Sequence, residues 1–375
     1  MAEPLKNSFG PNVIVAVADM LAQSQPDFDR EGFIELGSSG FEELELTARA
    51  RHLSSALAEM LPTDRGIALD IITNSLGATI DESELTGMEG FRYLPFVLFV
   101  AEHGLDHFEQ SMTAQYELTQ RFTAEFSIRA FITRYPDETM ERLRLWATDD
   151  SVHVRRLVSE GTRPRLPWAS RLPQFQADPT PVLDLLELLK DDSEEYVRRS
   201  VANNLNDISK DNPSIAVATA TEWWNDEPNR RRLVRHGLRT LIKEGDPDAL
   251  AVLGYIADSP VNLASITIEP SVVQIGDSIR MIATLDNATT ERHDVLVDFI
   301  VWFMKADGKV RPKVFKGKEL SIEGGDTAVI SKKISIAQHS TRTHYPGTHR
   351  VDVQINGVSR QGADFSVVPG TAPNP

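Results

Sequence analysis

The residues of this chain that could carry chemistry are three carboxylates in its first two-thirds. Glu160 and Asp207 each end a segment that contains a pair of arginines, and Glu125 lies one structural unit earlier. The sequence has no cysteine, no HExxH spacing among its nine histidines, no phosphate-binding glycine loop and no nucleophile elbow. We therefore expect carboxylate chemistry in a cleft, without a metal or a cofactor. A single acid on a helix is more often solvated or paired, and that alternative stays open for each of the three.

Arginines recur at equivalent places in three similar segments, which we call the arginine segments: His153 to Val158, Tyr196 to Val201, and Arg230 to Val234. The first two are preceded by Asp-Asp-Ser. If the segments stack as repeats, their arginines form a row, and a row at this spacing suits a run of phosphates. Further arginines follow the first segment. The residues predicted to contact a polyanion here are Arg155, Arg156, Arg163, Arg165, Arg198, Arg199 and Arg232. The alternative is that they pair with the abundant acids or cover a polar face.

The elements that must position these side chains are helices up to residue 257. Leu46, Ala50, Leu53 and Leu57 are spaced as one apolar stripe on a helix, and Pro and Asx residues mark helix ends. The arginine segments are 43 and 33 residues apart, as in an α-solenoid of stacked helix pairs. The longer interval contains a Pro-rich loop with Trp168. We expect Trp168 at the rim of a cleft, although a core position is more usual for tryptophan.

After a linker at residues 258–264, the hydrophobic period changes to two. Seven or so short strands over residues 265–368 predict an antiparallel immunoglobulin-like sandwich with Trp302 in its core, followed by a disordered tail at 369–375. Basic residues follow one another along this region. Those predicted to form a second phosphate-contacting surface are Lys313, Lys316, Lys318 and Arg342. A solubilising sheet face is the alternative.

The net charge of −16 is unevenly distributed along the chain. Residues 1–150 hold 26 acidic and 11 basic side chains, whereas residues 151–267 hold 17 and 15, and residues 268–368 hold 12 and 13. Binding to a polyanion depends on the field of one face, so the nearly neutral remainder can still present a basic surface. The N-terminus lacks a secretory profile and the apolar runs are short, so we expect a cytoplasmic monomer without a membrane partner.

Several longer segments are similar to one family. Ser159 to Trp168 (SEGTRPRLPW) and Tyr196 to Asp207 (YVRRSVANNLND) resemble the AlkC branch of the HEAT-repeat alkylpurine DNA glycosylases. Shorter matching segments extend the likeness over nearly the whole chain. They are Pro4 to Pro11, Thr123 to Phe126, Pro312 to Lys316, and Tyr345 to Arg350. Gly317 departs from the family pattern, in which a bulky residue is expected.

The resemblance implies HEAT-like repeats curving around duplex DNA and an immunoglobulin-like domain that completes the grip. It implies hydrolysis of the N-glycosidic bond of cationic N3-alkylated bases in bacterial DNA repair, chiefly 3-methyladenine, with 3-methylcytosine and 1-methyladenine as further candidates, and without base flipping. By motif, Glu125, Glu160 and Asp207 are the active-site carboxylates and Trp168 their aromatic neighbour. Such a lesion leaves readily because it already carries positive charge, so carboxylates need only stabilise the sugar cation and orient water.

Two other functions remain compatible with the sequence. A non-catalytic helical-repeat protein that binds damaged DNA would share the arginine row and would not need the acids. A protein–protein scaffold, which is the commonest use of helical repeats, would need neither.

Overall fold

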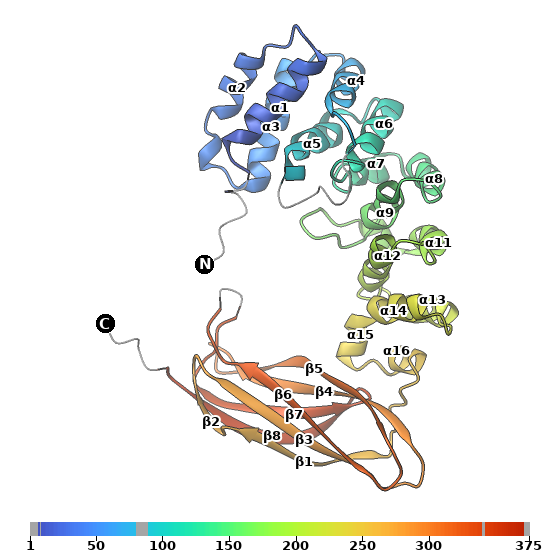
Figure 1. Ribbon diagram of the computed structural model, residues 1–375, viewed down its shortest axis with the longest axis vertical. Coiled ribbons are helices and arrows are strands. Elements are labelled where there is room, and N and C mark those ends of the chain that lie inside the picture. The colour runs from blue at the N-terminus through green and yellow to red at the C-terminus, as the bar shows by residue number, and fades with distance from the viewer. Residues whose placement is uncertain (1–6, 8, 80–88, 340–341, 371–375) are drawn as a thin grey trace. The chain divides into compact units, whose positions relative to one another are not determined.

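The computed structural model describes residues 7, 9–79, 89–339 and 342–370, and residues 371–375 of the predicted tail lie outside these ranges (Figure 1). Within them, an all-helical region of sixteen α-helices precedes eight β-strands, which confirms the predicted fold class. The first helices are α1 (Pro11–Ser24), α2 (Arg30–Ser38), α3 (Leu46–Met60), α4 (Arg65–Ser75), α5 (Leu94–His103), α6 (Phe108–Thr119), α7 (Ile128–Arg134) and α8 (Pro136–Trp146). The later helices are α9 (Val152–Gly161), α10 (Pro173–Ala177), α11 (Thr180–Leu189), α12 (Glu195–Ile208), α13 (Pro213–Trp223), α14 (Pro228–Gly237), α15 (Arg239–Glu244) and α16 (Pro247–Val252).

The helix ends follow from local sequence chemistry. Helix α3 buries Ala50, Leu53 and Leu57 on one face, as the apolar spacing predicts. The Asp64 carboxylate then caps α4 by accepting hydrogen bonds from the backbone N–H groups of Gly66 and Ile67. Helix α8 begins at a proline, which suits the first helical turn because the N–H there has no helical partner.

The arginine segments lie on neighbouring helices, as predicted for stacked repeats. Helix α12 packs against both α9 and α14, and α11 packs against α9 and α12 from the other layer (Figure 1). Helices α12 and α14 pack closely at Gly237, where a Cβ atom would lie 2.7 Å from Cδ2 of Leu205. The loop with Trp168 leaves the stack between α9 and α11 and includes the short helix α10.

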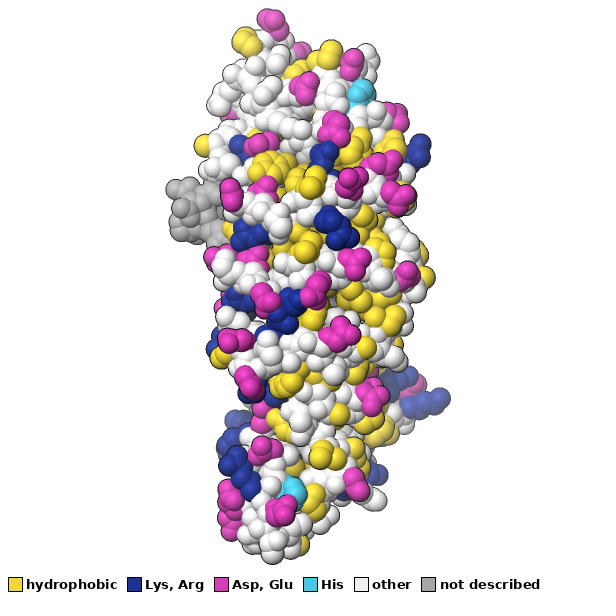
Figure 2. All heavy atoms as spheres, turned by 90° about the vertical axis from the view of Figure 1, so that its right-hand side faces the viewer, with side chains coloured by type: hydrophobic (Ala, Val, Ile, Leu, Met, Phe, Trp, Pro, Cys, Tyr) yellow, Lys and Arg dark blue, Asp and Glu magenta, His cyan; other side chains and the backbone are white. Residues whose placement is uncertain are grey.

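The outer layer of these repeats carries a mixed surface. Figure 2 looks onto the side on which α6, α8 and α11 lie, and there acidic and basic side chains are interspersed among hydrophobic ones. Such a mixture is typical of a solvated face. None of the described helices combines the length and the hydrophobicity that a membrane-spanning helix requires.

Packing divides the chain into two compact units, Met1–Asn212 with Glu227–Gly237, and Pro213–Asp226 with Leu238–Pro375. Helices α15 and α16 thus pack with the strands. Leu250 and Tyr255 form a small apolar cluster with Leu296 of the sandwich. The turn after α15 requires glycine at Gly245, because its φ is +79° and a Cβ there would lie 2.1 Å from the Gln354 amide nitrogen.

The strands form a sandwich of two sheets, ordered β1-β3-β6 and β2-β8-β7-β4-β5. All pairs are antiparallel except β2 with β8. The strands are β1 (Val261–Glu269), β2 (Val272–Gln274), β3 (Ser278–Asn287), β4 (His293–Met304), β5 (Val310–Ile322), β6 (Thr327–Ser335), β7 (Gly347–Ile355) and β8 (Val358–Val368).

The core of the sandwich corrects one expectation. Val301 and Phe303 of β4 point into the core, so the alternation of a strand places Trp302 on the opposite face. Trp302 is only half-buried, and its indole N–H donates to the Asp352 carboxylate at 2.8 Å. Phenylalanines occupy the position that the tryptophan was predicted to fill.

Candidate active site

Helices α9 and α12 bring two of the three predicted acids into one buried cluster. The apolar face of each helix packs into the repeat core, and Ser159 of α9 donates a hydrogen bond to Ser200 of α12 at 2.7 Å. Glu160 is 6% exposed and Asp207 is 1% exposed. Carboxylates are rarely buried to this extent unless they are paired, so their partners decide their chemistry.

Glu160 is held in its ionised form. Its Oε2 accepts from the Ser200 hydroxyl at 2.6 Å, and its Oε1 accepts from Arg163 Nη1 at 2.6 Å. Burial alone raises the pKa of this carboxyl, but the charges of Arg156 and Arg163 outweigh burial and leave the pKa below its ordinary value. Glu160 is therefore a permanent anion at neutral pH and has no proton to donate.

One arginine joins the two buried acids. The Nε of Arg163 donates to Asp207 Oδ2 at 2.8 Å, while its Nη1 bonds Glu160. The other oxygen of Asp207 accepts from Lys210 Nζ at 2.9 Å. The Lys210 side chain is far more exposed than the carboxylate it bonds. Arg163, predicted from sequence to contact phosphate, instead has its guanidinium bonded between carboxylates.

Glu125 completes the cluster from the segment between α6 and α7. Its Oε2 accepts from the Thr123 hydroxyl at 2.9 Å and from Arg156 Nη1 at 2.9 Å. Arg156 also approaches Glu160 at 3.6 Å and stacks over the Tyr196 ring. The three predicted acids thus lie along one chain of alternating charges, Glu125–Arg156–Glu160–Arg163–Asp207–Lys210.

Trp168 lies at the rim, as the sequence predicts. Its side chain is 75% exposed, and it lines a cavity of about 970 Å³ together with Glu125 and Glu160. Its φ is +65°, a left-handed backbone conformation that bulky residues rarely adopt. A large exposed aromatic ring in a strained backbone is typical of functional positions.

Other predicted arginines are engaged within the helical repeats. Arg155 makes a two-bonded ion pair with Asp192, with Nε 2.6 Å from Oδ2, and also donates to the carbonyls of Asp149 and Asp150. Arg165 pairs in the same manner with Asp211. The alternative of pairing with acids therefore describes both, and the structure offers no support for phosphate contacts at these two positions.

A different group of arginines faces solvent. Arg199 is largely exposed and lies 3.9 Å from Glu195, and Arg232 is exposed on α14. Both line a hollow of about 180 Å³, which Arg198 also lines while it donates to the Ser193 carbonyl at 2.6 Å. For these three residues, phosphate contact stays a prediction.

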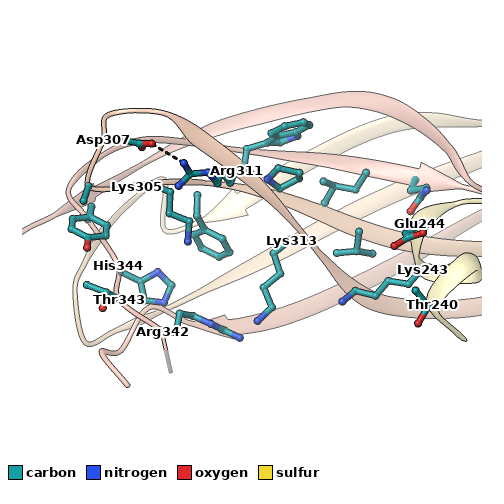
Figure 3. A pocket seen from close by; sticks show the side chains of 18 of the residues that line it. Thr240, Lys243, Glu244, Lys305, Asp307, Arg311, Lys313, Arg342, Thr343 and His344 are labelled. Atoms are coloured by element: carbon teal, nitrogen blue, oxygen red, sulfur yellow. Dashed lines mark hydrogen bonds and ion pairs between the residues drawn. The ribbon is translucent and has the colours of Figure 1, made fainter. Parts of the chain in front are cut away.

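The second compact unit has a cationic cavity of about 1350 Å³. Figure 3 shows Lys305, Lys313 and Arg342 around the same space as Lys243 of α15. Lys313 and Arg342 both stack on the Phe315 ring, each 5.7 Å from its centroid. Burial, Arg342, Lys243 and Lys305 all lower the pKa of Lys313, and such crowding of like charges favours an anion in the cavity.

His344 adds an unsatisfied group to this cavity. It is 3% exposed, and neither of its ring nitrogens has a hydrogen-bond partner among the described residues. Burial and the charges of Arg342 and Lys305 lower its pKa to about 4, so the ring is neutral. The cavity thus offers cations and a neutral imidazole. Lys316 and Lys318 lie on β5, as Lys313 does, but they are exposed and do not line the cavity.

Comparison with known proteins places the chain in a family. A family model described as "Uncharacterised protein YhaZ, C-terminal Ig-like domain" matches residues 262–369. The chain is 35% identical to the "Uncharacterized protein YhaZ" of Bacillus subtilis (strain 168), over 97% of this chain and 99% of that protein. It is also 35% identical to the Pseudomonas fluorescens alkylpurine DNA glycosylase AlkC, solved bound to DNA containing an abasic site analog. That structure covers 98% of this chain and 100% of its own chain, with a TM-score of 0.89.

The chain belongs to the AlkC/YhaZ family. This confirms the resemblance read from its segments. The departure at Gly317 has a structural reason, because β5 carries a bulge opposite Val297 and Phe299. A Cβ at this position would lie 2.1 Å from the Val297 carbonyl oxygen, so the bulge admits only glycine. Its N–H donates to Asp298 at 2.7 Å.

Sequence reasoning missed three residues of the site. Ser200 and Thr123 each bond one of the acids, and Arg129 is buried beneath the Trp168 loop. Ser200 stands where the first arginine segment has Leu157, so the repeat pattern does not predict a polar role for it. The available signal was that Ser200 and Thr123 both lie in segments that match the family. A buried arginine such as Arg129 is indistinguishable in sequence from a solvated one.

Proposed function

We propose that this chain is a DNA glycosylase that removes cationic N3-alkylated bases from duplex DNA, with 3-methyladenine as its chief substrate. The linked carboxylates Glu125, Glu160 and Asp207 carry the proposal, and the first two line one cavity with Trp168. The family relationship supports it, because the AlkC relative is an alkylpurine DNA glycosylase that was solved with DNA. 3-Methylcytosine and 1-methyladenine are the further candidate substrates.

The charge state of Glu160 limits the substrate. Removal of a neutral base needs a general acid to protonate the leaving group, and such an acid requires a raised pKa. The pKa of Glu160 is lowered by Arg156 and Arg163 despite burial, so this carboxylate cannot serve as that acid. A base alkylated at N3 carries its own positive charge and leaves without protonation. The site therefore favours cationic lesions.

The same carboxylates suit the remaining chemistry. As the glycosidic bond breaks, positive charge develops on the sugar, and fixed anions in a poorly solvated site stabilise it. We assign this stabilisation and the orientation of the attacking water to Asp207 and Glu160, with Glu125 assisting. Trp168 would lie against the sugar or the charged lesion, as aromatic faces attract cations. No flipping of the base is required.

The DNA contacts are proposed at cations that make no hydrogen bond to a carboxylate of the described chain. In the helical repeats we choose Arg198, Arg199 and Arg232, which line the hollow of about 180 Å³. In the sandwich, Lys313 and Arg342 line the cationic cavity, and Lys316 and Lys318 extend the basic strand. Phosphate contacts of this kind position duplex DNA without reading its sequence.

The test is release of 3-methyladenine from methylated duplex DNA under single-turnover conditions. Asp207→Asn and Glu160→Gln remove one negative charge each at nearly constant shape. We expect each to lower the excision rate constant by about 100-fold, as loss of one electrostatic stabiliser typically does. Asp192→Asn is the matched control, since this buried acid pairs with Arg155 outside the cluster, and it should stay within about 2-fold of wild type.

Duplex binding measured in parallel separates the possible functions. Duplex binding without base release would identify a non-catalytic DNA-binding repeat protein, and equal release by all four proteins would overturn the assignment of the acids. No affinity for duplex DNA at low salt would identify a protein scaffold. Release of uncharged alkylated bases as fast as 3-methyladenine would contradict the argument from the charge state of Glu160.

A further inference from the structure

A single buried arginine bonds both ends of the loop that carries Trp168. Arg129, in the first turn of α7, is 3% exposed. Its Nη1 donates to the carbonyls of Gly161 at 2.9 Å and Arg163 at 2.7 Å, where α9 ends and the loop begins. Its Nε donates to the Ser170 carbonyl at 3.1 Å, two residues beyond the tryptophan. The guanidinium therefore ties the two strands of the loop together.

No carboxylate lies within ion-pair distance of this guanidinium among the described residues. Burial and the charge of Arg163 lower the pKa of Arg129 to about 10. A buried cation without a paired anion is costly, so it is retained where its hydrogen-bond geometry has a use. The Arg129 guanidinium bonds carbonyl oxygens of the loop, so it fixes the positions of these backbone groups.

The loop needs such a constraint. Trp168 is held at φ +65°, which a bulky residue adopts only when its surroundings impose it. Within the loop, the Leu172 N–H donates to the Pro164 carbonyl at 3.2 Å and the Ala169 N–H to the Leu166 carbonyl at 3.4 Å. These two bonds are long. The side chains of Arg163 and Arg165 also tie the loop to the repeats, through Asp207 and Asp211, whereas Arg129 bonds the backbone at both ends of the loop.

We propose that Arg129 is a positioning residue that holds the 162–172 loop in the conformation presenting Trp168 beside Glu125 and Glu160. Arg129 lines the same cavity as these three side chains. Its action on base excision passes through Trp168, so that part rests on the proposed function. The planar fork of arginine spans three carbonyl oxygens at once, whereas a lysine ammonium is a point charge and cannot.

The first measurement does not depend on activity. Trypsin can cleave the loop after Arg165 and Arg171, and cleavage reports opening of the loop. We expect Arg129→Lys to speed cleavage at these two bonds by about 10-fold. Arg121→Lys is the matched control, since Arg121 is also buried and donates to a carbonyl, at Gly77, far along the chain from the loop. In Arg121→Lys, the bonds after Arg165 and Arg171 should be cleaved at the wild-type rate.

The second measurement is a double-mutant cycle on base excision. Arg129→Lys should lower the single-turnover rate constant by about 10-fold, as a small misplacement of a positioned group does, with little change in the enzyme concentration for half-saturation. In a Trp168→Ala background the same change should have less than about 2-fold further effect, because the group that it positions is gone. Thermal unfolding of each variant verifies that the fold is retained.

The outcomes are distinguishable. If Arg129→Lys is cleaved in the loop at the wild-type rate, Arg129 does not hold the loop. If the effects of Arg129→Lys and Trp168→Ala on the excision rate are fully additive, Arg129 does not act through Trp168. If Arg129→Lys does not fold, Arg129→Gln substitutes for it, since one amide group cannot bond both ends of the loop and faster cleavage is again expected. If the wild-type protein releases no base while trypsin cleavage of the loop responds as expected, the proposed function fails and the role of Arg129 in holding the loop is retained.

Discussion

The helical repeats and the sandwich both contain runs of basic residues, and they use them in opposite ways. In the acid cluster, Arg156 bonds Glu125, and Arg163 bonds the buried Glu160 and Asp207. In the sandwich cavity, Lys313 and Arg342 share one aromatic ring, and like charges lower the pKa of Lys313. The first group lowers the pKa of Glu160, and the second leaves its positive charge available to a ligand.

This difference shows that a basic residue acts through its partner rather than its type. A cation bonded to buried carboxylates fixes their position and protonation, and its removal exposes an unpaired buried charge. A cation crowded by other cations is relieved when a phosphate binds. Substitutions that look alike in sequence should therefore damage stability in one region and DNA affinity in the other.

The largest effect is expected where one cation serves two buried acids. Arg163→Met leaves Glu160 and Asp207 without their shared partner, and loss of one member of a buried ion pair destabilises by about 3–5 kcal/mol. Urea unfolding measures the change. Lys210→Met, which removes a far more exposed partner of Asp207, is the control and should lose under about 1 kcal/mol. Equal losses in the free energy of unfolding would show that burial of the Arg163 ion pairs does not add to stability.

The next effect concerns the sandwich cavity. Lys313→Gln combined with Arg342→Gln should weaken duplex binding about 10-fold. The double variant should also reduce the slope of log affinity against log salt by about 2, because each of the two cations would neutralise one phosphate. Arg311→Gln is the control on the same strand, because Arg311 is paired with Asp307 at 2.7 Å (Figure 3). A slope unchanged by the double variant contradicts the assignment of this cavity to DNA.

The pH dependence of excision tests whether Arg156 and Arg163 keep Glu160 ionised. Because Arg156 and Arg163 hold the pKa of Glu160 below its ordinary value, its carboxylate stays ionised as the pH falls, and excision should remain constant between pH 8 and about 5. Arg156→Met removes a lowering charge, so the pKa rises and the rate should fall about 3-fold or more at the acidic end. Rates corrected for spontaneous depurination decide the point. Identical profiles would mean that Arg156 does not set the charge of the site.

The smallest effect separates exposed from paired arginines within the repeats. Arg232→Gln should reduce the salt slope by about 1 and affinity about 3-fold. Arg155→Gln should leave both unchanged and lower the melting temperature instead, because it loses the ion pair with Asp192 and two carbonyl bonds. The reverse result would restore the arginine row expected from sequence alone.

Much of the fold was predictable from local patterns. The apolar stripe of α3 and the prolines at helix starts depend on neighbours within one turn, so the helices followed from sequence. The core of the sandwich did not, because the alternation along β4 fits either face until the second sheet is placed. That is why Phe299 and Phe303, and not Trp302, fill it.

The site divides in the same way. The sequence by itself determined the family, the two kinds of fold and the three candidate acids, because these depend on residue identity and local period. Only the tertiary structure decided which charges meet. Arg156 and Arg163 lie within one or two turns of Glu160 in sequence, yet their bonds to Glu125 and Asp207 span 31 and 44 residues. Ion pairs across stacked helices form between partners that no local spacing specifies, and they separate the locked arginines from the exposed Arg199 and Arg232.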